Sequence, residues 1–417
     1  MNVHVVKPIP IDFKQVVDAY GKVRHGGKSA GIDKESWGDF EKKLQDNLYV
    51  IWNRLASGTY FPSAVREVEI PKKDGSTRKL GIPTLRDRIA QEVVRKYMEQ
   101  RIDQNFHASS YGYRPLKSAR QAIEEVRKNC KATDWVIDLD ISKFFDEISH
   151  ELLLKAVGHV IEDKWVSMYV KRWLEMKVVN QAGEERARGS KGTPQGGVIS
   201  PLLANLYLHF ALDKWLEKHY GGIRFVRYAD DMVIHCASKE EAESLLCAIK
   251  ERLRAVELRL NEKKTQIVYC KDYRRTAKED KVQFGFLGFS YQPRKCHSKN
   301  GNKDYLGFTA EISKENQKKI TEAIRTTVDW RITQVKIETI AEKLNSRLMG
   351  WINYFGLYGK SSLRKTLLRL ERRLIKWIQK KYKISSIKEA VRKLSGIRKQ
   401  NPGLFYHWKE RRYCYNY

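Results

Sequence analysis

The chain has 417 residues, of which 41% are hydrophobic, which is enough for the cores of two or three domains and too many for a disordered tail. It carries 80 Lys and Arg against 50 Asp and Glu, a formal net charge of +30 that favours a polyanionic partner, nucleic acid first. The six cysteines include no Cys-x-x-Cys pair, which argues against a zinc ribbon or a disulfide framework. No apolar run approaches the roughly 20 residues of a membrane span and the N-terminus lacks a signal-peptide pattern, so we expect a soluble intracellular protein with no membrane partner.

The first part of the chain predicts a polar helical segment and then a basic hairpin. Residues 1–60 have a helical pattern. Residues 65–82 alternate apolar and charged positions on both sides of a KDG turn at residues 73–75, which predicts two strands. Lys72 and Arg78 lie beside that turn. Such a hairpin could close over a triphosphate, and a solvated basic loop is the alternative.

A helix is predicted over residues 86–101, and an aromatic turn, SYGYRP, follows at residues 110–115. Interleaved Tyr and Arg suit stacking on a nucleic-acid strand and charge contact with it. Arg114 is the charged residue of this turn, so we predict that it contacts nucleic acid. Ordinary packing of the loop is the alternative.

Two acids interrupt an apolar strand within residues 135–148, WVIDLDISKFFDEI. Side chains at positions i and i+2 share one face of a strand, so Asp138 and Asp140 could both point toward one metal ion. Buried acids in so apolar a strand are costly unless they are paired or bound to a metal. The alternating pattern leaves open which of the two is the ligand.

A compact loop, GTPQGG, occupies residues 192–197. Its glycines let the backbone approach a ligand closely, and Gln195 is the side chain there that can make directional hydrogen bonds. Ser200 followed by Pro201 then predicts the start of a helix, with Ser200 as its N-cap and a long amphipathic run to residue 220.

Residues 223–238, IRFVRYADDMVIHCAS, predict a β-hairpin with two adjacent acids at its tip. Asp230 and Asp231 repel each other, and a divalent cation such as Mg²⁺ is a natural partner for two carboxylates. A solvated Asp-Asp turn is the alternative. Because adjacent residues of a strand face opposite sides, we expect one of the pair to be a full metal ligand, and we favour Asp230.

The last part of the chain becomes helical and more basic. Residues 240–256 predict a helix, residues 284–292 a hydrophobic hairpin, and the polar segment 294–304 a linker. In LLRLERRLIKWIQKKYKI, which starts at residue 367, the apolar residues recur at helical spacing. The basic residues therefore lie largely on other faces, where they can meet phosphates, and a solvated charged helix is the alternative. These basic residues are Arg372, Arg373, Lys380 and Lys381.

Three motifs with polar or acidic residues occur in chain order: the strand that ends near Asp140, the GTPQGG loop and the YADD hairpin. Nucleotidyl transfer needs such motifs, because carboxylates from separate strands hold two metal ions on either side of the reacting phosphate. In these motifs, and in KSAGID, SYGYRP, IPKKDGSTRKLGIPTLRDR, LNEKKT, FLGFSY and RLMGWINYF, the chain resembles the reverse transcriptases encoded by bacterial group II introns. The resemblance covers nearly the whole chain.

The resemblance implies a right-hand polymerase fold of the α/β (α+β) class. It implies an N-terminal extension at residues 1–60 and fingers and palm, with an antiparallel palm sheet, at residues 61–300. A basic, all-α thumb or maturase domain with the C-terminal tail is expected at residues 301–417.

The resemblance also assigns roles residue by residue. The implied catalytic residues are Asp140, Asp230, Asp231 and Lys264, of which Lys264 would protonate the pyrophosphate. The implied metal site comprises Asp140, Ile141, Asp230 and Asp231, with Mg²⁺ as the expected cofactor and Mn²⁺ as its substitute. The residues expected to contact the incoming nucleotide are Lys72, Arg78, Phe145 and Gln195. Phe145 would exclude ribonucleotides by crowding the 2′-hydroxyl, and Lys73 is the alternative to Lys72.

The activity that the resemblance implies is RNA-directed DNA synthesis by a protein that also binds its intron RNA, assists splicing and copies the intron during retrohoming. Its partners would be the intron RNA template, dNTPs and a DNA primer or target, in the bacterial cytoplasm near the nucleoid. A splicing-only maturase and a domesticated free-standing reverse transcriptase for defence or repair are the alternatives. Many relatives carry an HNH endonuclease with paired cysteines, whereas only His407 and Cys414 follow Trp351 here, so we expect the endonuclease-less type.

Overall fold

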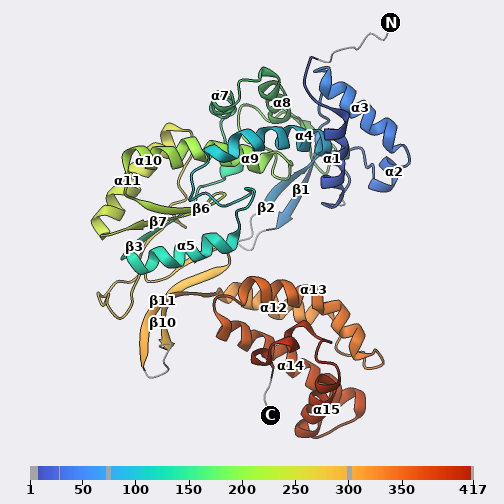
Figure 1. Cartoon of the computed structure of the whole chain (residues 1–417), viewed down its shortest axis with the longest axis vertical. Helices are drawn as coiled ribbons and strands as arrows, with labels where there is room; N and C mark the ends of the chain where they lie inside the picture. The colour runs from blue at the N-terminus through green and yellow to red at the C-terminus, as the bar shows by residue number, and fades with distance from the viewer. Residues whose placement is uncertain (1–7, 28, 72–76, 298–302, 415–417) are drawn as a thin grey trace. The chain divides into compact units, whose positions relative to one another are not determined.

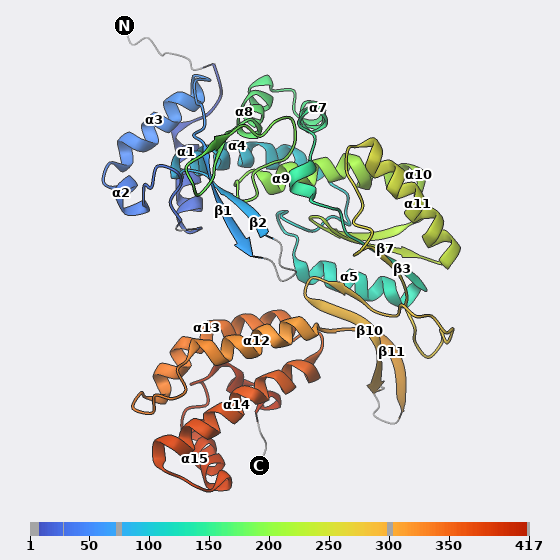
Figure 2. The same cartoon turned by 180° about the vertical axis from the view of Figure 1, so that it is seen from behind.

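The structure is a computed structural model, and it describes residues 8–27, 29–71, 77–297 and 303–414 (Figure 1). The chain divides into two compact units. Unit 1 comprises residues 1–122 and 137–266, and unit 2 comprises residues 123–136 and 267–417. Figures 1 and 2 show the elements of each unit from opposite sides. No helix in the described ranges is long and apolar enough to cross a membrane.

Unit 1 begins with helices and a mixed sheet. The helices are α1 (Phe13–Arg24), α2 (Trp37–Glu41) and α3 (Leu44–Ala56). The sheet has the order β2-β1-β4-β5 and consists of β1 (Val65–Pro71), β2 (Thr77–Ile82), β4 (Val178–Val179) and β5 (Glu185–Arg186). β1 and β2 are antiparallel, with Val68 opposite Leu80, so the two strands of the predicted basic hairpin are confirmed. Residues 72–76, which include its turn, lie outside the described residues.

The helix predicted at residues 86–101 is α4 (Leu85–Ile102), which packs against α1 and α3. Thr84 begins α4 because its hydroxyl accepts from the backbone N–H of Asp87 at 3.1 Å. Most of α4 is buried, including Ile89 and Val94. The remaining elements are η1 (Asp103–Asn105), α6 (Phe144–Glu147), α7 (His150–Val160), α8 (Lys164–Leu174) and α11 (Lys239–Ala255), while α5 (Ala119–Ala132) runs from unit 1 into unit 2.

A second sheet, with strand order β6-β7-β3-β8, contains the strand that precedes Asp140 and the hairpin that carries Asp230 and Asp231. Its strands are β6 (Arg224–Tyr228), β7 (Asp231–Cys236), β3 (Trp135–Leu139) and β8 (Gln266–Tyr269). The apolar stretches of β3 and β7 are buried, with Ile137 and Val233 fully covered. The acids therefore lie at strand ends: Asp140 directly follows β3, and Asp231 is the first residue of β7.

The helical run after the GTPQGG loop differs from its prediction. α9 (Ser200–Leu208) has Ile199 as its N-cap, and the Ser200 hydroxyl instead accepts from Thr193 Oγ1 at 2.9 Å. A π-helical turn, η2 (His209–Asp213), interrupts the run before α10 (Lys214–His219). Every residue of α9 except Pro201 is buried, so the amphipathic pattern predicted for it is wrong.

Unit 2 contains a sheet of order β11-β10-β9, formed by β9 (Phe284–Phe286), β10 (Phe289–His297) and β11 (Asp304–Ile312). The predicted hydrophobic hairpin is confirmed, because Phe289 pairs with Phe286. The predicted linker at 294–304 is wrong: residues 294–297 belong to β10, and His297 pairs with Asp304 of β11. This end of the hairpin is exposed or half-buried, so its sequence is polar on both faces and shows no alternation.

Helices α12 (Lys314–Thr327), α13 (Ile337–Phe355), α14 (Lys360–Tyr382) and α15 (Ile387–Gln400) follow this sheet in unit 2. Short turns η3 (Tyr406–Lys409) and η4 (Arg411–Tyr413) follow. The apolar stripe predicted for α14 is confirmed. Its buried members are Leu367, Leu370, Leu374, Trp377 and Ile378.

The C-terminal segment, residues 401–409, packs on these helices within unit 2. Asn345 of α13 donates its side-chain amide to Leu404 O at 2.9 Å and accepts from the backbone N–H of Tyr406 at 2.8 Å. In the same segment, Trp408 Nε1 donates to a carboxylate oxygen of Glu371 of α14 at 2.8 Å, and His407 Nε2 lies 2.8 Å from the same oxygen. The tail is therefore part of the folded unit, fixed through a buried carboxylate.

The buried carboxylate of Glu371 contributes to the free energy of unfolding, and this contribution can be measured. Glu371→Ala should lower the free energy of unfolding by about 3 kcal/mol, because it leaves buried donors of His407 and Trp408 without an acceptor. Burial acts to raise the pKa of Glu371, but the bonds from His407 and Trp408 outweigh it and hold the pKa below its ordinary value of 4.5. The stabilisation is therefore present at neutral pH and is lost as the pH falls through the lowered pKa.

Denaturant-induced unfolding of the full chain at neutral and acidic pH measures both effects. Glu371→Gln is the matched control, since its uncharged amide oxygen can still accept from the donors of His407 and Trp408, and it should lose less stability than Glu371→Ala at neutral pH. Equal losses for the two variants, or a loss that does not shrink in acid, would show that the carboxylate is not the anchor.

Candidate active site

The two adjacent acids lie where β6 turns into β7. The hairpin pairs Tyr228 with Asp231, so Ala229 and Asp230 form a two-residue turn, and the predicted acidic hairpin is confirmed. Ala229 has a left-handed backbone with φ of 57°. A non-glycine residue in this conformation is strained and persists only where the surroundings fix it.

Arg227 is one of the residues that fix this turn. Its side chain is fully buried, and one guanidinium nitrogen, Nη1, donates to Ala229 O at 3.0 Å and to Asn205 Oδ1 at 2.9 Å. The other two nitrogens donate to the carboxylate of Asp213 at the end of the π-helical turn, Nε at 2.8 Å. Burial acts to raise the pKa of Asp213, but the charge and hydrogen bonds of Arg227 outweigh it and lower the pKa.

The SYGYRP turn packs against the same backbone from another side. A Cβ atom on Gly112 would lie 2.4 Å from Ala229 N, so only glycine allows this approach. The carbonyl of Gly112 accepts from Asn205 Nδ2 at 2.6 Å, and the backbone N–H of Tyr111 donates to Arg227 O at 2.8 Å. Asn205 thus joins the acidic hairpin, through Arg227, to the aromatic turn.

Arg114, predicted to contact nucleic acid, is an anchor of its own loop in the structure. Its Nε donates to Asp103 Oδ1 at 2.7 Å and its Nη2 to Asp103 O at 2.9 Å. Its Nη1 donates to His107 O and Ser110 O at 2.9 and 2.8 Å. These contacts favour the loop-packing alternative, because every guanidinium nitrogen already has a protein acceptor.

Asp140 is held by the segment that precedes β8. Asn261 Nδ2 donates to Asp140 Oδ2 at 2.7 Å, and the backbone N–H of Asn261 donates to Asp140 O at 2.9 Å. The backbone N–H of Asp140 donates to Thr265 Oγ1 at 3.2 Å, and Lys264 Nζ lies 3.7 Å from Asp140 Oδ2. Ile141 follows with a buried side chain and a backbone bridge to Leu260. Sequence reasoning found these polar residues without assigning Asn261 or Thr265 to Asp140.

The acids act on one another electrostatically. Burial first, and then repulsion from Asp140, raise the pKa of Asp230, although its own backbone hydrogen bond and the charges of Arg78 and Lys264 oppose the rise. The side chain of Asp231 keeps an exposed surface, yet desolvation by the protein around it, followed by repulsion from Asp230, Asp140 and Asp138, raises its pKa to about 6. Negative charge therefore outweighs the positive charge of Arg78 and Lys264 in this cluster.

An oxygen-rich cluster with excess negative charge fits a hard divalent cation. In the described part of the chain no three His, Cys, Asp or Glu side chains are arranged to hold a metal ion by themselves. Mg²⁺ commonly takes only one or two carboxylates and completes its shell with water and substrate phosphates. The separate carboxylates of Asp140 and Asp230, of which the first raises the pKa of the second, match that requirement.

The GTPQGG loop lies against β2 and brings two predicted nucleotide contacts together. The backbone N–H of Gly81 donates to Gln195 O at 2.8 Å. Gly196 has φ of 119°, and a Cβ atom there would lie 2.5 Å from Gly81 O, so glycine is required. Arg78 Nε donates to Gln195 Oε1 at 2.6 Å. Lys72 and its alternative Lys73 lie outside the described residues.

Phe145 lies beside the same loop. Its carbonyl accepts from the backbone N–H of Thr193 at 2.8 Å, and its half-buried ring packs against Phe144 with centroids 5.4 Å apart. Gln195 Nε2 donates to Asp146 Oδ1 at 3.4 Å. The structure thus gathers Arg78, Phe145 and Gln195 at one loop, and the effect of Arg78 on the pKa of Asp230 links that loop to the acids.

The four basic residues predicted on α14 have different surroundings. Arg372 and Lys380 are exposed, and Arg373 lies with its guanidinium carbon 5.9 Å from the ring centre of Trp330. Lys381 Nζ donates to the carbonyls of Thr333 and Val335 at 2.8 and 2.7 Å. Their contact with nucleic acid remains a prediction, and for Lys381 part of the donor capacity is already used.

A mixed α/β fold that sets carboxylates from two strands beside a loop with a guanidinium and an amide has the features of a nucleic-acid polymerase. The chain belongs to the reverse transcriptase family: residues 70–309 match the family described as reverse transcriptase (RNA-dependent DNA polymerase). Residues 317–395, which span most of α12 to α15, match the group II intron maturase-specific domain.

Known proteins with similar sequences agree with this membership. Protein YkfC of Escherichia coli (strain K12) is 34% identical over 290 residues, which cover 59% of this chain and 74% of that protein. The group II intron-encoded protein LtrA of Lactococcus lactis subsp. cremoris is 35% identical over 193 residues, 46% of this chain and 31% of LtrA. The putative COX1/OXI3 intron 1 protein of Saccharomyces cerevisiae is 35% identical over 167 residues, 40% of this chain and 20% of that protein.

Proposed function

We propose that the protein is an RNA-directed DNA polymerase encoded by a group II intron, and that it binds intron RNA to assist splicing. The observation that carries this proposal is the presence in one chain of a reverse transcriptase region and a maturase-specific region. The carboxylate cluster lies in the first region and supports catalysis. The basic helices of the second support binding to structured RNA through phosphate contacts and shape.

We assign the parts of the right-hand fold accordingly. Residues 61–300 would supply fingers and palm, with β6-β7-β3-β8 as the palm sheet, and α12 to α15 would form the thumb or maturase domain. Substrates would be dNTPs, an intron RNA template and a DNA primer or target. The maturase-specific match favours the intron-encoded type over a domesticated free-standing enzyme.

In the proposed reaction Asp140 and Asp230 would hold two Mg²⁺ ions, with Asp231 as an auxiliary and Ile141 contributing through its backbone. When bound, the cations would activate the primer 3′-hydroxyl and neutralise charge on the reacting phosphate and the pyrophosphate. Asn261 orients the carboxylate of Asp140 through its amide. Lys264, an exposed cation 3.7 Å from Asp140, would donate a proton to the leaving pyrophosphate.

The nucleotide would be bound by the loop beside the acids. Arg78 offers a guanidinium to the triphosphate, and Gln195 holds that guanidinium through its side-chain oxygen at 2.6 Å. Lys72 would add a second positive charge. Phe145 would lie against the sugar and exclude a 2′-hydroxyl by its bulk.

Two assays on the full chain test the proposal. Primer extension on an RNA template with dNTPs should proceed with Mg²⁺ and stop when the cation is chelated. Splicing of the flanking intron RNA should be stimulated without dNTPs. Splicing without extension would overturn the polymerase and favour a splicing-only maturase, and extension with no effect on splicing would favour the free-standing enzyme.

A further inference from the structure

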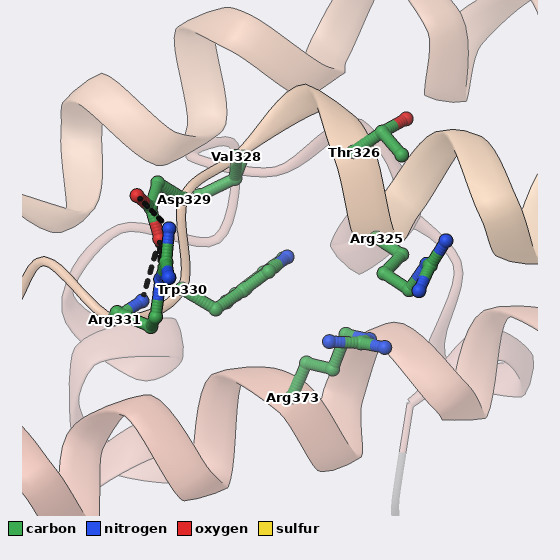
Figure 3. Close-up of a pocket in the computed structure, with 7 residues that line it drawn as sticks. All are labelled: Arg325, Thr326, Val328, Asp329, Trp330, Arg331 and Arg373. Atoms are coloured by element: carbon green, nitrogen blue, oxygen red, sulfur yellow. Dashed lines mark hydrogen bonds and ion pairs between the residues drawn. The ribbon is translucent and has the colours of Figure 1, made fainter.

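A cavity of about 500 Å³ lies in unit 2 where α12 ends, with α14 on its other side (Figure 3). This volume is in the range of sites for small ligands and is too small for a duplex. Arginines and one tryptophan dominate its lining. The lining residues are Arg325, Thr326, Val328, Asp329, Trp330, Arg331 and Arg373.

The indole of Trp330 has a fixed orientation in this cavity. Its Nε1 donates to Ile324 O at 2.9 Å, which ties the ring to the last turns of α12. Figure 3 shows the ring extending into the cavity toward the side where Arg325 and Arg373 lie. A half-buried aromatic ring held in this way can present a face to a planar ligand without further loss of side-chain entropy.

Positive charge exceeds negative charge around the ring. Arg325 pairs with Glu322 at 2.6 Å, and Arg331 pairs with Asp329 at 3.1 Å. Among the described residues no carboxylate forms an ion pair with Arg373, although its charge contributes to the lowered pKa of Glu322. Repulsion between Arg325 and Arg373 is therefore only partly offset by protein groups.

Two more arginines contact α12 from neighbouring helices, one in the middle of α12 and one at its last residue. Arg369 of α14 donates to Thr321 Oγ1 at 2.9 Å, and Arg347 of α13 donates to Thr327 Oγ1 at 2.7 Å. The C-terminal end of a helix attracts cations, but only with about half an elementary charge. Five arginines against the two acids Glu322 and Asp329 exceed what that end can offset, so the surface suits a bound anion.

We infer that this cavity binds one unpaired nucleotide of an RNA strand, with its base stacked on Trp330 and a flanking phosphate between Arg325 and Arg373. Phosphate contact alone would not need the tryptophan, and a base in a duplex does not expose its face. Stacking on an aromatic ring combined with arginine contacts is the usual chemistry of single-strand recognition. The inference deepens the proposed function and rests on it, because it names unpaired RNA as what the maturase region binds.

Binding of two labelled probes to the full chain tests the site: an unstructured 12-nucleotide RNA and the RNA duplex of the same sequence, followed by fluorescence anisotropy. Trp330→Leu should weaken binding of the single strand roughly 10- to 100-fold and leave duplex binding unchanged. Trp330→Phe, which can still stack, should restore most of the affinity. Arg373→Gln should weaken binding of the single strand. It should also lower the slope of log affinity against log salt concentration by about one.

Arg364→Gln is the matched control, because Arg364 is an exposed arginine of α14 outside the cavity. It should affect single strand and duplex alike. Wild-type affinity of Trp330→Leu and Arg373→Gln for the single strand, or an equal loss with the duplex, would overturn the inference. Full displacement of the RNA by AMP at equal concentration would mean a free-nucleotide site and would overturn it too.

Primer extension by the wild-type chain separates this inference from the proposed function. If the chain extends a primer but Trp330→Leu and Trp330→Phe bind single strands as the wild type does, the cavity assignment fails alone. If the variants show the expected pattern while the wild type extends no primer, the polymerase proposal fails and the single-strand site stands.

Discussion

Asp230→Asn should reduce RNA-templated primer extension by about 10³-fold. A catalytic cation supplies several kcal/mol of transition-state stabilisation, and a loss of that size corresponds to about three orders of magnitude in rate. Burial first, and then repulsion from Asp140, raise the pKa of Asp230, so its anion is costly until a cation binds. Single-turnover extension in Mg²⁺ measures the rate.

The same replacement should not weaken the fold. It removes a charge that Asp140 repels, so the metal-free variant should melt at the same temperature as the wild type or above it. Adding Mg²⁺ should raise the melting temperature of the wild type more than that of the variant, since only the wild type keeps both proposed ligands, Asp140 and Asp230. This pattern separates a lost ligand from a misfolded palm.

Asp138→Asn is the matched control, because Asp138 also lies near the acids but accepts from Gln266 Nε2 at 3.1 Å. It should retain most of the extension rate. Asp231→Asn should show an intermediate loss, as expected for an auxiliary acid. Wild-type extension by Asp230→Asn would remove Asp230 from the site and would leave Asp231 as the alternative ligand of the turn.

The strands and turns around the site were predictable because their signals are local. Two β-rich runs on either side of Asp230 define the hairpin, and the glycines of the GTPQGG loop mark a close backbone approach that the structure places at Gly81. The polar strand at residues 294–297 was not predictable, since exposure on both faces removes the alternation that identifies a strand.

The side chains that fix the acidic turn come from distant parts of the sequence, and no short sequence pattern indicates which of them will meet. Alternation within β6 indicates only that Arg227 shares a face with Phe225 on the hairpin. Its partners are Asp213, beyond a π-helical turn, and Asn205, in a helix that looked amphipathic. Charged residues inside otherwise apolar runs were the available signal, but they do not specify which acid meets which base.

Arg227 is therefore the second residue for which we expect a large effect. Arg227→Met should lower the free energy of unfolding by about 3–5 kcal/mol, because it leaves the buried carboxylate of Asp213 without its counter-charge. Arg227→Lys keeps a charge but cannot donate to Asp213, Asn205 and Ala229 together. We expect Arg227→Lys to fold and to extend primers roughly 10- to 100-fold more slowly, the usual cost of losing a group that orients a metal ligand.

The loss in Arg227→Lys should fall on kcat, with KM for dNTP nearly unchanged. Arg227 contacts the turn that carries Asp230, and its hydrogen bonds include none to the described residues predicted to contact the nucleotide, Arg78, Phe145 and Gln195. A merely structural defect would instead lower the fraction of active enzyme without changing its dependence on Mg²⁺. The half-saturating Mg²⁺ concentration therefore reports on the position of the turn, and an unchanged value would contradict the assignment.

A double variant separates stability from positioning. Arg227→Met combined with Asp213→Leu removes both charges, and a buried ion pair replaced by apolar groups often costs little stability. The double variant should therefore unfold at a higher denaturant concentration than Arg227→Met alone. Its extension rate should stay low, because the carbonyl of Ala229 still lacks the donor that holds its left-handed turn. Recovery of rate together with stability would mean that the Arg227 network acts on the fold and not on the placement of Asp230.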